Sequence, residues 1–334
     1  MIAVGVIGYG YWGPNLARNF AELETSTLAA LSDRSETRLD LARRRYPGCR
    51  TYRDHHELLA DPAIEAVAIA TPVGTHHPIT MEALAAGKHV LLAKPMAASA
   101  AAAEAMIAEA RLRERVLLVD HTFCYTGAVR RIRELIQDGA LGDLYYYDSV
   151  RVNLGLFQHD VDVVWDLAVH DLAIMNYVLP FRPVEVSATG AGHFDSDRHN
   201  LSYVTLFFEN NLIAHLHVNW MAPVKVRRTL IGGSREMIVY DDLEPSDKIK
   251  VYDRGIEVSN REQIYSMLVS YRTGDMWAPN LDLTEALQTE CRHFVDCIQH
   301  GTTPLTGGEA GLEVVRVLEA ASRSMKDRGR PVKT

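Results

Sequence analysis

Over the first 120 residues, short apolar runs alternate with longer runs in which apolar and polar residues repeat at helical spacing. The short runs predict buried strands at 2–7, 27–32, 64–70, 88–93 and 116–119. The amphipathic runs between them predict helices at 14–22, 35–45, 54–60, 78–86 and 99–114. Strands that alternate with helices in this way predict a doubly wound parallel sheet, and we assign residues 1–120 to one α/β domain.

After residue 120 the pattern changes to successive apolar stretches separated by short turns. Strands are predicted near 144–152, 183–190, 200–209, 212–221, 225–232, 235–240 and 248–252. Helices are predicted at 127–138, 163–179, 283–300 and 308–327, and a long polar loop at 254–282. Consecutive strands with tight turns predict a large, open, mostly antiparallel sheet, so we assign residues 121–334 to an α+β domain.

Three glycines follow the first predicted strand in the spacing Gly8-x-Gly10-x-x-Gly13. The first permits a tight turn, the second lets a pyrophosphate approach the backbone, and the third lets the next helix pack against the strand. The N-terminus of that helix then faces the phosphates. Asp33 follows the second apolar run, where a carboxylate can bind ribose hydroxyls. Strand, glycines, helix and acid together predict a Rossmann-type dinucleotide site.

Residues in the glycine turn and next to Asp33 affect which dinucleotide is bound and how it is held. A carboxylate accepts hydrogen bonds from both ribose hydroxyls and repels a 2′-phosphate, so Asp33 favours NAD over NADP. Arg34 stacks on the adenine in one interpretation and binds a 2′-phosphate in another. Tyr11 and Trp12 lie in the glycine turn, where Trp12 either covers the pyrophosphate or simply packs.

The composition is that of a globular protein, with 47% hydrophobic and 23% charged residues. The formal net charge of −8, without a recurring basic stripe, argues against a nucleic-acid partner. No apolar run reaches transmembrane length, and a strand begins at residue 2, so we expect neither a membrane segment nor a signal peptide. We therefore expect a cytoplasmic protein.

The four cysteines form no Cys-x-x-Cys pair and are expected to be reduced thiols. His293, Cys297 and His300 share one face of a predicted helix, a spacing that suits metal ligation. An apolar stripe that includes Cys291 runs beside them, and the pattern offers no fourth ligand. We therefore predict no metal site.

Several short motifs along the chain carry a resemblance to a known family. They are Gly8 to Gly13, Ala70-Thr71-Pro72 with His76, Ala86 to Val90, Lys94-Pro95, and Asp166-x-x-x-His170. With these motifs the chain resembles the Gfo/Idh/MocA oxidoreductases over essentially its whole length. Its second half is similar to a subgroup associated with nucleotide-sugar and surface-polysaccharide pathways, through Arg151 to Phe157 and Pro223 to Arg228.

The resemblance implies nicotinamide-dependent oxidation of a secondary alcohol, or the reverse reduction. Such chemistry needs a proton acceptor and a positive group near the developing oxygen charge, while the cofactor carries the hydride. Lys94, directly after a predicted strand, is the implied positive group. His170 is the implied base, and Asp166 orients it or binds a substrate hydroxyl. The reverse division, in which Lys94 transfers the proton, stays open because burial lowers a lysine pKa.

One position departs from the family pattern, which reads Glu-Lys-Pro. Ala93 stands where that glutamate would be, directly before Lys94. The glutamate would accept hydrogen bonds near the nicotinamide and the lysine. We therefore expect its absence to loosen the positioning of both groups.

Further cofactor and substrate contacts follow from the resemblance and from strand ends. Thr71, Pro72 and His76 match family positions that line the cofactor. His121 follows a predicted strand, which places it beside the nicotinamide ribose or the substrate, or in a purely structural role. Arginines suit a diphosphate because a guanidinium binds two oxygens at once. A solvated sheet face or a subunit contact would explain the substrate candidates equally well; these are Tyr125, Arg151, Asn153, Arg227 and Tyr271.

Taken together, these features predict an NAD-dependent oxidoreductase that acts on a ring hydroxyl or ketone of a sugar, with a nucleotide sugar as the favoured substrate. One alternative is a dehydrogenase of free sugars or inositols. Another is a non-catalytic regulator that responds to the dinucleotide. The resemblance also implies a homodimer or homotetramer.

Overall fold

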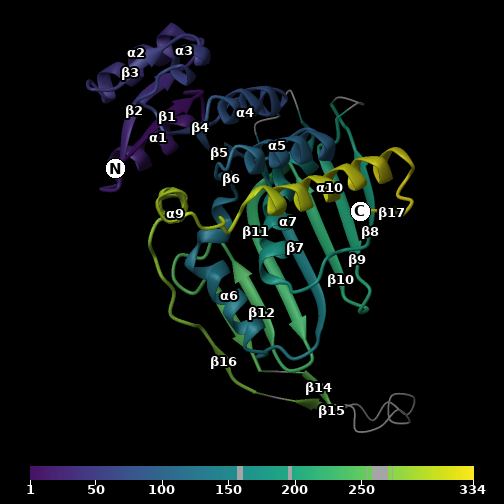
Figure 1. The fold of residues 1–334 in the computed structure, drawn as a ribbon. Coiled ribbons are helices and arrows are strands. Elements are labelled where there is room, and N and C mark those ends of the chain that lie inside the picture. The colour runs from purple at the N-terminus through teal and green to yellow at the C-terminus, as the bar shows by residue number, and fades with distance from the viewer. Residues whose placement is uncertain (156–160, 195–197, 254, 258–269, 273) are drawn as a thin grey trace. The chain divides into compact units, whose positions relative to one another are not determined.

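The computed structural model describes residues 1–155, 161–194, 198–253, 255–257, 270–272 and 274–334, and for 255–257 and 270–272 it describes the backbone alone. The chain divides into two compact units (Figure 1). The first comprises Met1–Tyr125 and Thr284–Glu319, and the second comprises Thr126–Leu283 and Ala320–Thr334.

The first unit contains a six-stranded sheet in which every neighbouring pair is parallel, which confirms the predicted doubly wound fold. Strands β1 to β3 are added toward one edge of the sheet and β4 to β6 toward the other, so the strand order reverses between β1 and β4. Sheets of this kind bind ligands at the carboxyl ends of the strands around such a point. The sequence does not predict β3, whose three residues are too few to show a strand pattern. The order is β3-β2-β1-β4-β5-β6, with β1 (Ile2–Ile7), β2 (Ser26–Ser32), β3 (Arg50–Tyr52), β4 (Ala66–Ile69), β5 (His89–Ala93) and β6 (Leu117–Asp120).

Helices from both ends of the chain build the core of this unit. The rings of Phe20 on α1 and Phe294 on α9 meet edge to face with centroids 6.2 Å apart, and Cys291 is buried in the same core. Residues 284–319 therefore pack with the first unit, which differs from the sequence-based division at residue 120. The helices are α1 (Gly13–Glu22), α2 (Glu36–Arg45), α3 (His55–Leu59), η1 (Val73–Thr75), α4 (His76–Ala85), α5 (Ala100–Leu112), η2 (Thr122–Tyr125), α9 (Ala286–His300) and the start of α10 (Gly308–Lys326).

The second unit is built on a nine-stranded sheet that is antiparallel apart from the pairing of β7 with β10. This confirms the predicted large, mostly antiparallel sheet. The order is β16-β13-β12-β11-β7-β10-β9-β8-β17, with β7 (Leu144–Leu154), β8 (Glu185–Ala191), β9 (Leu201–Phe207), β10 (Ile213–Asn219), β11 (Met221–Gly233), β12 (Met237–Asp241), β13 (Ile249–Tyr252), β16 (Met276–Trp277) and β17 (Val332–Lys333).

The predicted loop over 254–282 is wrong in part. Within its described residues, β14 (Gly255–Glu257) pairs with β15 (Ser270–Arg272), and β16 adds an edge to the large sheet. Strands of two or three residues are too short for an alternating pattern to reveal them in a polar stretch.

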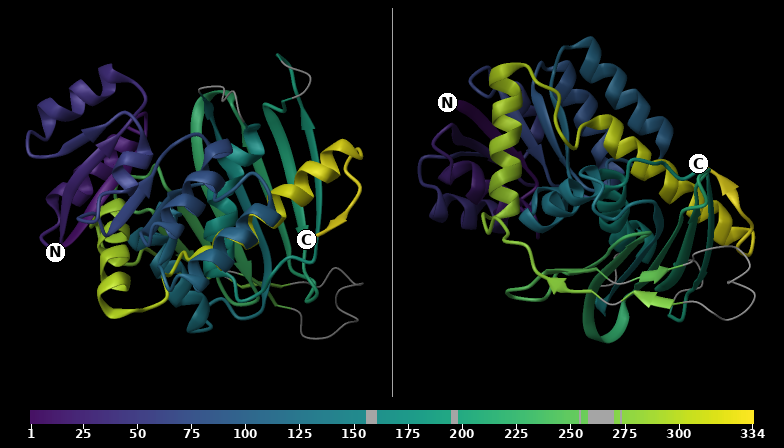
Figure 2. Two further views of the ribbon diagram at one scale, coloured as in Figure 1. Left: turned by 45° about the horizontal axis from the view of Figure 1, so that its top comes forward. Right: turned by 90° about the horizontal axis from the view of Figure 1, so that it is seen from below.

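Strand alternation gives the large sheet one covered face and one exposed face. On β10, Ala214 and Leu216 are buried, whereas Ile213 at the start of the strand is exposed. On β9, Val204 is buried and its neighbour Tyr203 is exposed. The helices α6 (Gly127–Gln137) and α7 (Val169–Val178) lie on the covered face (Figure 2). Among the described helices of the protein, none combines the length and the apolar character needed to cross a membrane.

A buried ion pair fastens α7 to the sheet. Arg151 on β7 donates from Nε to Asp171 Oδ2 at 2.7 Å and from Nη2 to Oδ1 at 3.1 Å, and Ser149 Oγ donates to Oδ1 at 2.9 Å. Both charged side chains are only 3% exposed. Arg151 is therefore an internal partner of Asp171, and we withdraw the prediction that it binds substrate.

This pair makes a testable contribution to stability. Arg151→Met leaves the Asp171 carboxylate buried without its cation, which should lower the free energy of unfolding by about 3–5 kcal/mol in urea titrations. Arg151→Met/Asp171→Leu should recover most of that loss, because an apolar pair carries no buried charge. Arg228→Met, at an exposed arginine of β11, is the matched control and should stay within about 0.5 kcal/mol of the parent. Equal losses in the single and double variants would contradict this account of the pair.

Candidate functional site

The glycine turn after β1 allows two backbone segments to approach closely. Gly8 has a φ of +94°, and a Cβ there would lie 2.7 Å from the carbonyl oxygen of Ala70. A Cβ on Gly13 would lie 2.0 Å from the carbonyl oxygen of Gly8. Only glycine fits at these two positions, and their close packing sets the first turn of α1 against the end of β1, where its N–H groups can face a phosphate.

A carboxylate is fixed beside this turn. Asp33, directly after β2, accepts from the backbone N–H of Tyr9 at 2.7 Å and from that of Ser35 at 2.8 Å. Its side chain is 7% exposed, and Arg38 Nη1 lies 3.4 Å from Oδ2. The two backbone bonds orient the carboxylate at the place where the sequence predicts a ribose contact.

The cation that pairs with this acid is Arg38, and both Arg38 and the predicted adenine or phosphate contact Arg34 are exposed. A Cβ on Gly10 would lie 3.6 Å from Arg38 Nη1, so this guanidinium also borders the glycine turn. Sequence reasoning overlooked Arg38 because it considered only the residue next to Asp33. The available signal was its place one turn into α2, which carries its side chain back toward the start of the helix.

The indole of Trp12 is held by a buried carboxylate at the end of β6. Its Nε1 donates to Asp120 Oδ2, and Thr122 Oγ1 donates to Oδ1 of the same carboxylate, which is buried at the end of β6. Glu290 of α9 lies beside Asp120, and burial together with that neighbouring acid raises its pKa well above the usual range. Tyr11, the other predicted residue of the turn, is 87% exposed.

Lys94 and His121 meet at the carboxyl edge of the sheet. Lys94 directly follows β5 and is half-buried, and His121 directly follows β6 and is 3% exposed. Burial, with the positive charge of Lys94 as a second cause, lowers the pKa of His121 to about 4. Neither ring nitrogen of His121 has a hydrogen-bond partner among the residues that the structure describes. A neutral imidazole in this position offers one donor and one acceptor to a ligand.

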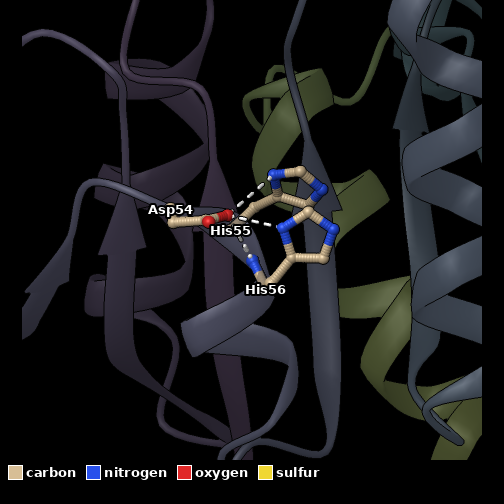
Figure 3. A group of neighbouring side chains, drawn as sticks. All are labelled: Asp54, His55 and His56. Atoms are coloured by element: carbon tan, nitrogen blue, oxygen red, sulfur yellow. Dashed lines mark hydrogen bonds and ion pairs between the residues drawn. The ribbon is translucent and has the colours of Figure 1, made fainter.

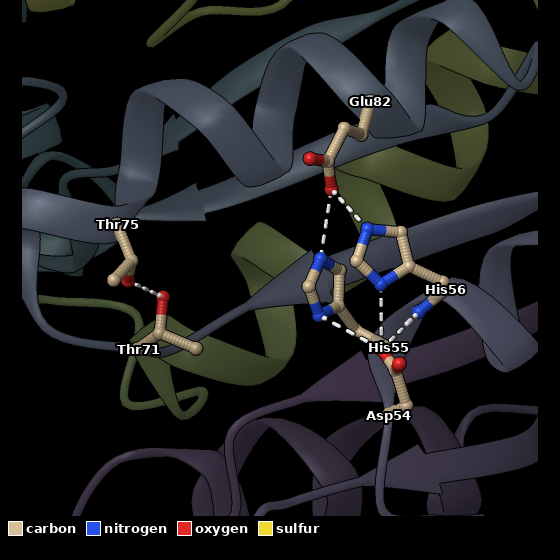
Figure 4. Close-up of polar contacts among 6 residues, drawn as sticks. All are labelled: Asp54, His55, His56, Thr71, Thr75 and Glu82. Atoms are coloured by element: carbon tan, nitrogen blue, oxygen red, sulfur yellow. Dashed lines mark hydrogen bonds and ion pairs between the residues drawn. The ribbon is translucent and has the colours of Figure 1, made fainter.

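His76 holds the backbone around Lys94. Its ring is buried, with Nδ1 2.9 Å from the carbonyl oxygen of Pro95 and Nε2 2.8 Å from that of Thr71. The ring thus connects the end of β4 to the Lys94–Pro95 turn and acts as a positioning residue. Thr71 Oγ1 accepts from Thr75 Oγ1 at 2.8 Å (Figure 4), and Pro72 lies between them on the surface.

In the second unit, Asp166 and His170 do not lie on one regular helix as predicted. Asp166 is in a π-helical turn, η3 (Val164–Ala168), and His170 is in the first turn of α7 that follows. Asp166 Oδ2 accepts from Trp220 Nε1 at 3.0 Å. The wider π turn changes the spacing that a regular helix would give to these two residues, and such turns occur frequently at functional sites.

The remaining substrate candidates are distributed unevenly. Tyr125 is buried and its hydroxyl bonds Thr306 Oγ1 at 3.1 Å, so we withdraw it as a substrate residue. Arg227 donates to Asp242 Oδ2 at 3.0 Å and is partly exposed. Asn153 is half-buried near the end of β7. Tyr271 belongs to β15, and its side chain lies outside the described residues.

The residues of the first unit fit a bound dinucleotide. The glycine turn leaves no room for a side chain but exposes a helix N-terminus, Asp33 is preoriented, and His121 presents unpaired polar atoms beside Lys94. The glycine turn suits a pyrophosphate, Asp33 suits a ribose, and Lys94 with His121 suits a nicotinamide.

Comparison with known proteins agrees with this geometry. Residues 2–121 match the model of an oxidoreductase family with an NAD-binding Rossmann fold, and residues 129–239 match the GFO/IDH/MocA C-terminal domain. Myo-inositol 2-dehydrogenase of Thermotoga maritima is 24% identical over 343 residues, covering 97% of this chain and 96% of that protein. UDP-N-acetylglucosamine 3-dehydrogenase of Acidithiobacillus ferrooxidans is 28% identical over 254 residues, covering 75% and 77%.

A solved structure of that second enzyme is similar to this chain over nearly its full length. It matches with a TM-score of 0.82 and 25% identity, covering 98% of each chain. The two family models cover the parallel sheet and most of the antiparallel one, which are the two parts of the fold described above. The chain therefore belongs to the Gfo/Idh/MocA family of NAD-binding oxidoreductases.

Proposed function

We propose that the protein transfers a hydride between NAD and a ring hydroxyl or ketone of a nucleotide-linked sugar. The observation that carries the proposal is that Lys94 lies near a neutral His121, whose ring nitrogens have no partner among the described residues, at the carboxyl edge of a sheet whose glycine turn and Asp33 suit a dinucleotide. The inositol and nucleotide-sugar dehydrogenases to which the chain is similar support a substrate with a ring carbinol.

The proposed division of labour follows the charges that the reaction creates. The nicotinamide, when bound, supplies the hydride chemistry. Lys94 places a positive charge at the substrate oxygen, where negative charge develops as the hydroxyl proton leaves. His170 accepts that proton, and Asp166, itself held by Trp220, orients the acceptor or a neighbouring substrate hydroxyl. His121 accepts or donates one hydrogen bond to the ribose or the substrate.

Asp120 is our candidate for the carboxylate that Ala93 does not provide. Ala93 on β5 is paired in register with Asp120 on β6, so the two side chains leave the same face of the sheet. The Asp120 carboxylate is also bonded to Trp12, which connects it to the glycine turn. In this proposal the carboxylate that stabilises the positive charge of Lys94 is supplied by β6 and not by the neighbouring strand β5.

A turnover screen tests the function, with NAD reduction followed by absorbance against nucleotide sugars, free sugars and inositols. We expect a nucleoside diphosphate group to improve kcat/KM by orders of magnitude. Higher turnover with a free sugar or an inositol would favour the alternative dehydrogenase, a possibility that the similarity to myo-inositol 2-dehydrogenase supports. Tight NADH binding without turnover of any candidate would indicate a dinucleotide-responsive regulator.

Lys94→Ala should lower kcat by at least about 100-fold while NADH affinity changes little, because the variant loses the charge that stabilises the transition state. The measurement is steady-state turnover of the best substrate, with NADH binding followed by fluorescence. Lys326→Ala, at an exposed lysine of α10, is the matched control and should turn over normally. Near-parental kcat in Lys94→Ala would remove this residue from the mechanism.

The preference for NAD should depend on Asp33 and Arg38 together. Asp33→Asn keeps an acceptor for the turn but loses the charge, so NAD should bind about tenfold more weakly, with a smaller loss for NADP. Arg38→Ala should weaken NADP more than NAD, and Arg34→Ala should change neither by a comparable factor. Dissociation constants for both cofactors measure these effects. Equal losses for NAD and NADP in Asp33→Asn would show that the ribose is recognised elsewhere.

A further inference from the structure

Two histidines at the start of α3 lie beside Asp54 with their rings tilted to each other (Figure 3), and Glu82 lies on their opposite side (Figure 4). Asp54 precedes α3, His55 and His56 form its first turn, and Glu82 lies on α4. The imidazole centroids are 4.1 Å apart and the rings are tilted by 34°. All four side chains belong to the first unit, and none of them has a part in the oxidoreductase chemistry proposed above.

In both rings the same nitrogen faces the same acid. Asp54 Oδ1 lies 2.6 Å from His56 Nδ1 and 3.6 Å from His55 Nδ1. On the opposite edge, Glu82 Oε2 lies 2.8 Å from His55 Nε2 and 3.5 Å from His56 Nε2. The Nδ1 atoms therefore face Asp54, and the Nε2 atoms face Glu82, as the dashed lines in Figure 4 show.

We propose that Asp54, His55 and His56 bind a divalent transition-metal ion of the zinc class. One ligand atom of each residue lies within 4.8 Å of the others. A tetrahedral ion with bonds of about 2.0–2.1 Å holds its ligands roughly 3.3 Å apart, and the two Asp54 distances of 2.6 and 3.6 Å fall on either side of that value. The ion takes the place of the proton between Asp54 and His56, and water completes the coordination.

Glu82 supplies the outer part of the site. Metal-bound histidines usually donate their second ring N–H to a carboxylate, which fixes the tautomer and the ring orientation. Glu82 is placed to accept from the Nε2 of both rings when their Nδ1 atoms hold the ion. This arrangement favours the Asp54 edge over the Glu82 edge as the binding position, and the ion would then connect the start of α3 to α4.

Helix capping alone does not account for the cluster. Asp54 Oδ1 accepts from the backbone N–H of His56 at 3.0 Å, which is an ordinary cap. A cap uses one carboxylate oxygen and needs neither imidazole nor Glu82. Within the part of the chain that the structure describes, no other three His, Cys, Asp or Glu side chains bring ligand atoms together this way. At the site considered from sequence, His293 Nε2 instead accepts from the N–H of Leu305 at 3.0 Å.

The test is titration of the full-length, chelator-treated protein with Zn²⁺ in competition with a chromophoric chelator. We expect one equivalent to bind, and we expect His55→Ala/His56→Ala to weaken that binding at least 100-fold. His77→Ala, at a half-buried histidine of α4 outside the cluster, is the matched control and should bind like the parent. Circular dichroism and NADH binding establish that each variant is folded.

Two conservative variants separate ligation from helix stability. Asp54→Asn keeps a capping oxygen and should still fold, but it should lose most of its Zn²⁺ affinity with the charge. Glu82→Gln should keep one equivalent and bind it about 10–100-fold more weakly. With Co²⁺ as the probe, the spectrum should show nitrogen and oxygen ligation without a thiolate charge-transfer band.

Three results would overturn the proposal. The first is a parent protein that binds no stoichiometric Zn²⁺. The second is unchanged affinity in the folded double-histidine variant. The third is a thiolate band with Co²⁺, which would assign the ion to one of the four cysteines instead.

Discussion

The candidate site depends on one steric constraint, which is the close approach of backbone segments at Gly8 and Gly13. A Cβ on Gly13 would lie 2.0 Å from the carbonyl oxygen of Gly8, and a Cβ on Gly8 would lie 2.7 Å from that of Ala70. Because no side chain fits there, the end of β1, the start of α1 and the end of β4 converge. Two further cofactor candidates are connected to this convergence: Asp33 accepts from the N–H of Tyr9 inside the turn, and Trp12 at the end of the turn donates to Asp120.

Buried charges in both units are balanced by specific partners, and this positions the functional groups. In the first unit, the buried Asp120 carboxylate accepts from Trp12 Nε1 and Thr122 Oγ1, and burial together with Asp120 raises the pKa of Glu290. In the second unit, Asp171 is held by Arg151 and Ser149, which anchors the helix turn that carries His170. The groups proposed to take part in the reaction therefore lie next to buried polar groups, and the hydrogen bonds and ion pairs of these groups offset the free energy lost when they leave water.

Features set by local sequence were predictable, and features set by distant pairing were not. The glycine turn, the cap Ser99, whose hydroxyl accepts from Ala102, and the left-handed Gly301 after α9 each follow from a few adjacent residues. Arg151 was misread because its partner Asp171 is 20 positions away and nothing in a single strand reveals the pair. The contact of Trp12 with Asp120 spans 108 positions and joins the start of α1 to the end of β6. The π turn at Asp166 likewise leaves no mark on hydrophobic spacing, and Glu82 completes the histidine cluster from another helix.

The most direct test of the central claim is a crystal structure of the protein grown with NAD. The account predicts the pyrophosphate at the Gly8–Gly13 turn, both adenosine ribose hydroxyls on Asp33, and the nicotinamide within contact of Lys94 and His121. A dinucleotide bound elsewhere, or one whose nicotinamide points away from Lys94 and His121, would contradict it.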